Sequence, residues 1–260
     1  NLDDKNEEGS LKVINVNLKY NNAFNISHKQ ASIFINNSFN LAHDLSVNND
    51  VLGLINCPID KNLLKKNNIG VTELLASKCK VKNNSEVMLI RNKRFAVCPI
   101  TTHIDIKNVS KSLKSEIIIN KIITINNFFK KFFKKKPKIG ILGLNPHNAE
   151  MKKNSEEKKI ILPAILRLKK KGIKLSGPLV SDTIFIKDYK NYDVIVGMYH
   201  DQVLTPFKTI FQFDAINVTL GLKYLRVSPD HGVAKKLILK NEANPKSLIE
   251  CINFINKYGT

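Results

Sequence analysis

The sequence predicts an α/β protein with a largely parallel sheet, and three observations support that fold class. Short apolar runs rich in Val and Ile alternate with longer amphipathic stretches, as in repeated βα units. The apolar runs are continuous rather than alternating, which is typical of strands buried on both faces. At 260 residues, of which 43% are hydrophobic, the chain is long enough to form one large α/β domain or two lobes.

Five apolar runs are predicted to be strands, and they span residues 51–56, 95–102, 139–144, 194–199 and 216–220. A helix is predicted over residues 154–171, because Asn154 or Ser155 can cap its first turn and Gly172 follows its last. Pro163 lies inside that stretch and predicts a kink, since proline has no N–H to donate.

Residues 128–136 interleave phenylalanines with lysines, a pattern also found in segments that bind membranes or nucleic acids. The four phenylalanines lie at i, i+1, i+4 and i+5, so a helix places them on one face, and Pro137 ends that helix. We therefore favour a helix that packs its phenylalanines into the core and exposes its lysines.

A net charge of +20 raises the question of nucleic-acid binding, because lysines and arginines neutralise phosphates. Only four of the 42 basic residues are arginines, while Asn, Ile and Lys are used throughout, as expected from a genome rich in A and T. We therefore favour a solvated, lysine-rich surface and expect no nucleic-acid partner. Where lysine is used so freely, each arginine indicates a place that needs a planar, bidentate guanidinium.

Cysteine usage and the lack of targeting segments predict a cytoplasmic protein. The four cysteines are scattered without CxxC pairs, as reduced structural cysteines are, and indicate neither a zinc knuckle nor a disulfide framework. The first ten residues are acidic and polar, unlike a secretory signal. No run reaches the roughly 18 apolar residues of a membrane-spanning helix, so we expect no membrane partner.

His103, His147 and His200 each follow the apolar run of a predicted strand within three residues. Ligands of open α/β sheets bind beyond the carboxyl ends of the strands, so the three histidines can converge on one site. Three imidazoles suit a divalent transition metal with open coordination positions. His28 and His43 have no such context and are interpreted as incidental.

The stretch after His200 is dense in polar groups set among apolar residues. Lys208, Asn217 and Arg226 are candidates for binding an anionic substrate, and Arg226 is suited to a bidentate contact with a phosphate or carboxylate. The sequence DHG at residues 230–232 either supplies a further polar or acid-base group or forms a turn.

Five motifs follow one another along the chain: GLNPHNAE (143–150), GPLVSDTIF (177–185), YDVIVGMYHDQ (192–202), NVTLGL (217–222) and SPDHG (228–232). In order and spacing they resemble the 4-hydroxythreonine-4-phosphate dehydrogenase family of vitamin B6 biosynthesis. The resemblance covers the chain from about Val51 to its end.

This resemblance implies a three-layer α/β/α fold with two lobes, like that of isocitrate and isopropylmalate dehydrogenases. We expect residues 1–65 and 240–260 to form the first lobe, and residues 66–239 to form the second, which carries the metal and substrate motifs. The family further implies a homodimer with active sites at the dimer interface, where histidines of both subunits bind the metal.

The resemblance also implies residue roles by motif position. The implied metal ligands are His103, His147 and His200, the implied substrate contacts are Thr72, Lys208, Asn217 and Arg226, and the implied catalytic groups are Lys208, His200 and Asp201. The metal is expected to be zinc, cobalt or magnesium, and the hydride acceptor NAD or NADP, to which no binding residue is assigned.

The implied reaction oxidises 4-phosphohydroxy-L-threonine to 2-amino-3-oxo-4-phosphobutanoate, which loses carbon dioxide to give 3-amino-2-oxopropyl phosphate on the route to pyridoxal 5'-phosphate. A metal ion lowers the pKa of the substrate hydroxyl and stabilises the enolate that develops on decarboxylation. Lys208 assists proton transfer or binds phosphate, and the sequence leaves both roles open.

Departures from the family pattern leave alternatives open. The family's GHTE is GVTE here, with Val71 in place of the histidine; NPHAGE is NPHNAE; Cys57 stands where the family has glycine; and the family's N-terminal GEPxGIGPE loop has no counterpart. The alternatives are a dehydrogenase of a related four-carbon acid, such as threonate or erythronate 4-phosphate, and a degenerate relative that binds metal and anion without turnover. A nucleic-acid-binding protein is a third alternative, which only the charge favours.

Overall fold

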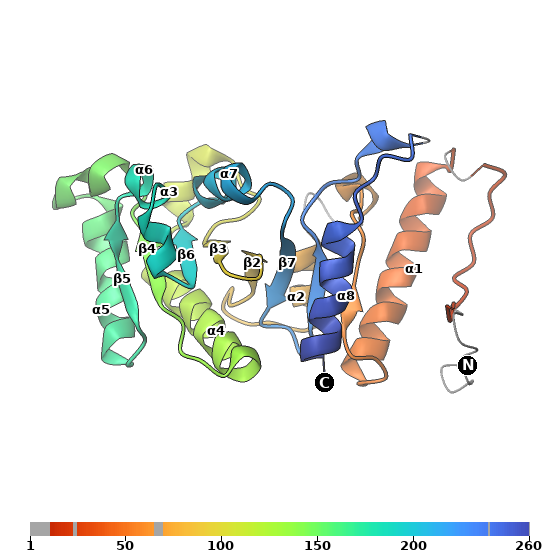
Figure 1. Cartoon of the computed structure of the whole chain (residues 1–260), viewed down its shortest axis with the longest axis horizontal. Helices are drawn as coiled ribbons and strands as arrows, with labels where there is room; N and C mark the ends of the chain where they lie inside the picture. The colour runs from red at the N-terminus through yellow and green to blue at the C-terminus, as the bar shows by residue number, and fades with distance from the viewer. Residues whose placement is uncertain (1–10, 23–24, 65–69, 239, 260) are drawn as a thin grey trace.

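The computed structural model describes residues 11–22, 25–64, 70–238 and 240–259. Within these residues, eight strands form one sheet with the order β1-β8-β7-β2-β3-β6-β4-β5 (Figure 1). The strands are β1 (Leu54–Ile55), β2 (Val87–Arg91), β3 (Ala96–Pro99), β4 (Ile139–Leu142), β5 (Leu175–Leu179), β6 (Val194–Gly197), β7 (Ile216–Leu220) and β8 (Arg226–Pro229).

Four of the seven strand pairings described are parallel. β3, β6, β4 and β5 form a parallel block, and β1 pairs in parallel with β8. β2 is antiparallel to both β3 and β7, and β7 is antiparallel to β8. The short β2–β3 connection explains the antiparallel centre, because a parallel crossover needs a dozen or more residues. The predicted α/β class with a mostly parallel sheet is confirmed.

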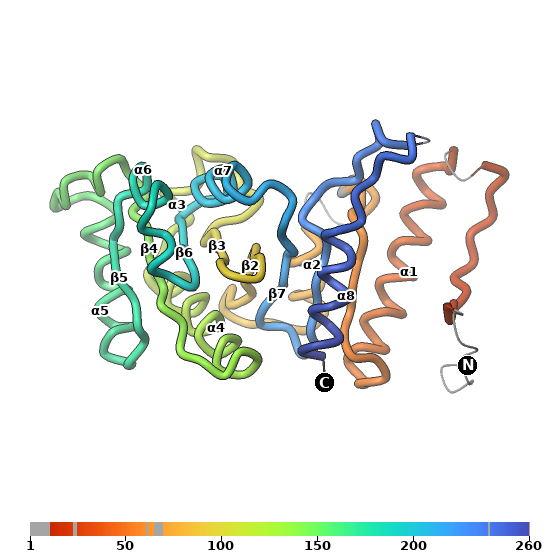
Figure 2. Tube along the Cα trace, in the orientation of Figure 1, coloured from red at the N-terminus to blue at the C-terminus, as the bar shows by residue number. Residues whose placement is uncertain are grey.

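Helices cover both faces of the sheet, which gives the predicted three layers (Figure 1). α4, α5 and α8 pack on one face, and α6 and α7 pack on the other. α1 and α2 pack together beside β1, and Figure 2 shows α1 and α5 at opposite ends of the molecule. The α-helices are α1 (His28–Val47), α2 (Val71–Lys78), α3 (Val109–Ser112), α4 (Ser115–Phe133), α5 (Leu162–Lys170), α6 (Ser181–Ile184), α7 (His200–Phe211) and α8 (Lys246–Tyr258). Shorter helical segments are η1 (Lys61–Leu63), η2 (Ile106–Asn108), η3 (Pro146–Met151), η4 (Glu157–Ile161), η5 (Asp188–Asn191) and η6 (Lys235–Leu237).

The helix rich in phenylalanine and lysine packs into the core as predicted. Phe128 and Phe129 of α4 are 7% and 4% exposed, whereas Lys130 and Lys131 face solvent. No helix in the described part of the chain is long and apolar enough to cross a membrane.

The helix predicted over residues 154–171 forms with an irregular first half. The Ser155 hydroxyl accepts a hydrogen bond from the Lys158 N–H at 3.2 Å, which makes Ser155 the cap. The π-helical turn η4 then leads into α5, whose first turn contains Pro163. The irregularity lies on the N-terminal side of Pro163, because proline donates no hydrogen bond back into that turn.

The predicted division into two lobes stays a prediction. β1, from the predicted first lobe, pairs with β8, from the predicted second, within one sheet of the described residues. β1 covers only two residues of the predicted run 51–56, since only Leu54 and Ile55 find partners on β8.

Candidate active site

A cavity of about 470 Å³ lies over the centre of the sheet, between α2 and α7. Its floor includes Met88 and Ile90 of β2 and Asn217 of β7, which point to the same face because side chains alternate along a strand. α2 contributes one wall and α7 the other. Residues 228–232, at and just beyond the end of β8, complete the lining.

Seven of the eight residues predicted to form the site line this cavity: Thr72, His103, His200, Asp201, Lys208, Asn217 and Arg226. The eighth, His147, is exposed in η3 and is not among the lining residues. β3, β6 and β4 are parallel neighbours, so His103, His200 and His147 all follow the carboxyl edge of the sheet, as predicted. Within the chain, the structure therefore brings together two of the three histidines.

His103 and His200 form a close pair with ring centroids 5.7 Å apart. His200 sits at the first position of α7, and its Nδ1 is 2.6 Å from Asp201 Oδ1. When Nδ1 donates to this carboxylate, the lone pair on Nε2 is free for a metal ion or a substrate proton. No group of three or more His, Cys, Asp or Glu side chains within the described ranges is placed to hold a metal.

Glu73 supports the other histidine and was missed by sequence reasoning, although it belongs to the GVTE motif. Its Oε1 accepts a hydrogen bond from Thr102 Oγ1 at 2.8 Å and lies 3.7 Å from His103 Nδ1. Burial acts to raise the pKa of Glu73, but His103 and Thr102 outweigh it and lower the pKa to about 2. Glu73 is therefore an anion beside His103, and its buried Oε2 has no hydrogen-bond partner in the described structure.

The GVTE motif begins with glycine because position 70 has no room for a side chain. A Cβ at this position would lie 2.6 Å from Glu73 Oε2 and 3.0 Å from His103 Cε1. Any larger residue would therefore displace Glu73 and His103. The next residue, Val71, lines the cavity where the family has histidine, so it gives this part of the wall an apolar surface.

Arg226 is a buried cation at the start of β8, with 2% of its surface exposed. Its Nε donates to Asn56 Oδ1 at 2.7 Å, and its Nη1 donates to Thr219 Oγ1 at 2.8 Å. Thr219 Oγ1 also lies 3.2 Å from Thr72 Oγ1. Burial lowers the pKa of Arg226 to about 10, and no carboxylate of the described chain lies within ion-pair distance. An anionic ligand would supply the missing countercharge.

Two more polar groups of the cavity have unusual surroundings. Asn217 Oδ1 is buried and has no hydrogen-bond donor among the described residues. Lys208 Nζ donates to the Asp230 carbonyl at 3.2 Å and lies 3.3 Å from Asp230 Oδ2. Burial raises the pKa of the Asp230 carboxyl, and Lys208 opposes that shift. Of the two interpretations of the DHG sequence, the structure favours a polar group that contacts Lys208.

The backbone that leads to His147 is hydrogen-bonded to another buried carboxylate, that of Glu157. Glu157 Oε1 accepts hydrogen bonds from the N–H groups of Leu144 and Asn145 at 2.8 and 2.7 Å. Residues 147–151 then adopt positive φ angles between 46° and 56°. They include Ala149, which replaces the glycine of the family's NPHAGE motif.

Comparison with known proteins agrees with this architecture. Residues 1–255 match the family described as pyridoxal phosphate biosynthetic protein PdxA. The chain belongs to this family. The 4-hydroxythreonine-4-phosphate dehydrogenase of Sulfurihydrogenibium sp. is 43% identical over 204 residues, which are 76% of this chain and 62% of that protein. The protein of the same name from Wigglesworthia glossinidia brevipalpis is 35% identical over 253 residues, 95% of this chain and 76% of that protein.

Solved structures of PdxA relatives share the fold. The 4-hydroxythreonine-4-phosphate dehydrogenase of Burkholderia phymatum superposes with a TM-score of 0.77 at 27% identity, covering 98% of this chain and 79% of that one. The enzyme from Klebsiella pneumoniae gives a TM-score of 0.75 at 28% identity, covering 87% and 70%. Isocitrate dehydrogenase of Methylococcus capsulatus, with a TM-score of 0.51 at 11% identity over 77% of this chain and 66% of that one, shares the fold alone. The chain spans 62% and 66% of the length of its relatives from Sulfurihydrogenibium and Aquifex aeolicus.

Proposed function

We propose that this PdxA family member oxidises 4-phosphohydroxy-L-threonine with NAD or NADP and releases carbon dioxide and 3-amino-2-oxopropyl phosphate, a step of pyridoxal 5'-phosphate biosynthesis. The observation that carries the proposal is one cavity that holds the unpaired cation Arg226 together with His103 and His200. A phosphorylated hydroxy acid offers an anionic group for the guanidinium and a hydroxyl for the histidines. The names of the relatives support this choice of substrate.

Arg226 is proposed to hold the substrate's phosphate or carboxylate. Nε and one N–H of Nη1 are bonded to the protein, so the guanidinium is fixed in orientation and three N–H groups of Nη1 and Nη2 remain to donate to oxygens of the substrate. Asn217 Oδ1, a buried acceptor without a donor in the described structure, would accept from the substrate's amino group or from a hydroxyl. Thr72, whose Oγ1 contacts Thr219 Oγ1, lines the same cavity and would add a hydroxyl contact.

Of the divalent ions zinc, cobalt and magnesium, the histidine pair fits zinc and cobalt better, because magnesium prefers oxygen ligands. The centroid separation of 5.7 Å is compatible with two ring nitrogens that each lie about 2.1 Å from one shared ion. Asp201 and Glu73 stand behind the two rings, as outer carboxylates commonly do at metal sites. When bound, the metal would polarise the substrate hydroxyl while the nicotinamide accepts the hydride.

His147 of a second copy is proposed as the third metal ligand. The residue follows the same edge of the sheet as the pair but does not line their cavity, and its side chain is exposed. A site that needs His147 from another copy would make the active protein a homodimer, with each cavity at the interface.

Lys208 is proposed to carry the proton of the second step. Oxidation leaves a ketone beta to the substrate's carboxylate, and loss of carbon dioxide transfers the electrons of the broken C–C bond to an enolate. The Lys208 ammonium would then donate its proton to that carbon, and its contact with Asp230 would hold it in position. Val71, Ile90 and Leu204 give this part of the cavity apolar walls that limit the access of water.

Val71 favours a second candidate substrate. Valine forms no hydrogen bond at the position where the family has histidine, so the cavity offers one polar contact fewer. Threonate or erythronate 4-phosphate carries a hydroxyl in place of the amino group and would pair with Asn217 equally well.

The test is a comparison of initial rates of NADH and NADPH formation with the three phosphorylated acids, after loading the protein with zinc, cobalt or magnesium. We expect the highest kcat/KM with 4-phosphohydroxy-L-threonine and no turnover by the His200→Ala variant. A protein that binds metal but oxidises none of the three acids would refute the proposal and indicate the degenerate relative.

The shared site has its own test, in which His103→Ala and His147→Ala variants are mixed and reassociated. If His147 acts across the interface, each mixed dimer regains one intact site, and random mixing restores roughly a quarter of the wild-type activity. If all ligands came from one chain, no combination of the two variants would regain activity.

A further inference from the structure

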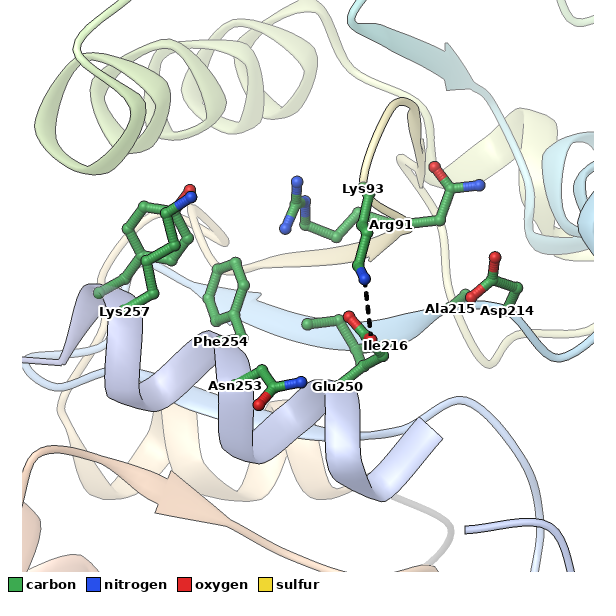
Figure 3. Close-up of a pocket in the computed structure, with 11 residues that line it drawn as sticks. Arg91, Lys93, Asp214, Ala215, Ile216, Glu250, Asn253, Phe254 and Lys257 are labelled. Atoms are coloured by element: carbon green, nitrogen blue, oxygen red, sulfur yellow. Dashed lines mark ion pairs between the residues drawn. The ribbon is translucent and has the colours of Figure 1, made fainter. Parts of the chain in front are cut away.

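A second cavity, of about 310 Å³, lies on the opposite face of the sheet between the β2–β3 turn, the start of β7 and α8 (Figure 3). We call it the rear cavity. Arg91 and Ile216 line it, while their chain neighbours Ile90 and Asn217 line the candidate active site. This alternation follows from the pleat of the two strands. The two cavities share no lining residue.

Arg91 reaches the rear cavity with its guanidinium held between aromatic rings. The guanidinium carbon lies 4.8 Å from the centre of the Phe133 ring and 5.1 Å from that of Phe254. The two rings are inclined at 81° to each other, so the guanidinium cannot stack flat on both, and an aromatic face is only a weak acceptor for an N–H group that points at it. Across the described residues, no side-chain acceptor or carboxylate pairs with Arg91, and burial lowers its pKa. Its donors are therefore fixed in direction and available to a ligand.

The uncompensated charge of the rear cavity is positive. Glu250 is paired with Lys93 at 3.2 Å, as Figure 3 shows, and Asp214 is paired with Lys246 at 3.2 Å. Lys257 projects from the same face of α8 as Glu250 and has no carboxylate partner within the described part of the chain. Glu250 also favours the charged form of Arg91 without forming an ion pair with it, so the lining, which has three cations and two carboxylates, keeps one positive charge in excess.

The turn that carries the basic side chains is rigid. Asn92 Oδ1 accepts hydrogen bonds from the N–H groups of Arg94 and Phe95, each at 2.9 Å. This closes the β2–β3 turn directly after Arg91. A site whose donors are fixed before the ligand arrives loses little conformational entropy on binding.

We propose that the rear cavity binds a small anion through a phosphate or carboxylate group held by Arg91 and Lys257. The guanidinium fork matches two oxygens of either group, and Lys257 adds a second charge. The volume is that of a pocket for a small molecule. The chain uses only four arginines among 42 basic residues, and this one has no protein anion among the residues described.

The site is tested by NMR of the four arginine Nε–Hε groups while inorganic phosphate or acetate is added at constant ionic strength. Arg91→Lys and Arg167→Lys variants assign two of the signals, and Arg167, which is exposed on α5, serves as the control. We expect the Arg91 signal to shift and saturate with phosphate, with acetate, or with both, which also identifies the preferred group. Binding at the candidate active site is reported separately by the Arg226 signal. An Arg91 signal that moves no more than that of Arg167 would overturn the proposal.

A second variant keeps the test independent of folding. Lys257 is exposed, so Lys257→Gln should preserve the backbone spectrum. It should raise the anion concentration at which the Arg91 signal is half-saturated by about tenfold, which is the effect of one lost charge-assisted contact. Lys130→Gln removes the same charge from α4, outside the rear cavity, and should leave the half-saturation concentration unchanged. Equal effects of the two variants would show only general attraction to a basic surface and would refute the site.

Discussion

Replacing Arg226 with methionine should separate the cost of burying its charge from its use in binding. Burial lowers the pKa of Arg226 well below its ordinary value, to about 10, so burying the charged form destabilises the folded protein by about 3 kcal/mol. Methionine removes that cost but leaves Asn56 Oδ1 without its donor, which costs about 1–3 kcal/mol. Thr219 keeps its contact with Thr72. The contributions oppose each other, so we expect the free energy of unfolding to change by less than about 2 kcal/mol.

Substrate binding by Arg226→Met should fall much further than stability. Two charge-assisted hydrogen bonds to an anion contribute about 3–6 kcal/mol, and their loss weakens binding more than about a hundredfold. The assays are urea unfolding followed by circular dichroism and calorimetric titration with 4-phosphohydroxy-L-threonine. Arg226→Lys, which keeps the charge but not the fork, is the matched control and should retain part of the affinity.

The destabilisation caused by burying the Arg226 charge depends on pH. Because the pKa of Arg226 is lower in the folded protein than in the unfolded chain, its destabilising contribution is complete below about pH 10. It is relieved only as the pH rises beyond about 10 toward the ordinary pKa of arginine. Measurements near neutral pH therefore register the whole cost. A loss of more than about 4 kcal/mol of stability with unchanged substrate affinity would show that Arg226 is structural and would refute the reasoning.

Glu73→Gln should lower the free energy of unfolding near neutral pH by up to about 3 kcal/mol, because the pKa of Glu73 in the folded protein is about 2. The difference from wild type should vanish as the pH falls from 4.5 toward 2. A difference that stays unchanged in acid would contradict the ionic role of Glu73. Ala149→Gly should stabilise the protein by about 1 kcal/mol in urea unfolding, since φ at Ala149 is 46°, and a loss of stability would argue against that backbone conformation. Phe129→Ala should cost about 3–5 kcal/mol, while the exposed neighbour Lys130→Ala changes stability by less than about 0.5 kcal/mol; comparable losses would contradict the packing of α4.

The sequence predicts several of the elements whose signals are local, although it missed β2, whose apolar run VMLIR is buried in the sheet. β7 has its predicted bounds, and the cap at Ser155 forms as expected. β5 and β8 could not be predicted, because they contain proline, glycine or buried polar residues that disfavour a strand in isolation, and pairing with β4 and β7 makes them strands. β1 is shorter than predicted because the length of an edge strand depends on its partner.

The candidate site also contains residues that the sequence identifies and residues that it does not. His103, His200 and Arg226 could be identified from residue type and position at strand ends or in motifs, and they share one cavity. Glu73 and Asn56 act through contacts with residues 30 and 170 positions away, at His103 and Arg226, which no local pattern reveals. Completion of the histidine set by His147 depends on a second copy and stays a proposal.

A crystal structure of the protein with 4-phosphohydroxy-L-threonine bound would test the proposed active site directly. We expect an anionic group of the ligand within hydrogen-bond distance of Arg226, a polar hydrogen of the ligand on Asn217 Oδ1, and the reacting hydroxyl on the side of His103 and His200. A ligand bound outside this cavity, or bound within it without contacting Arg226, would show that the active site is not the one proposed.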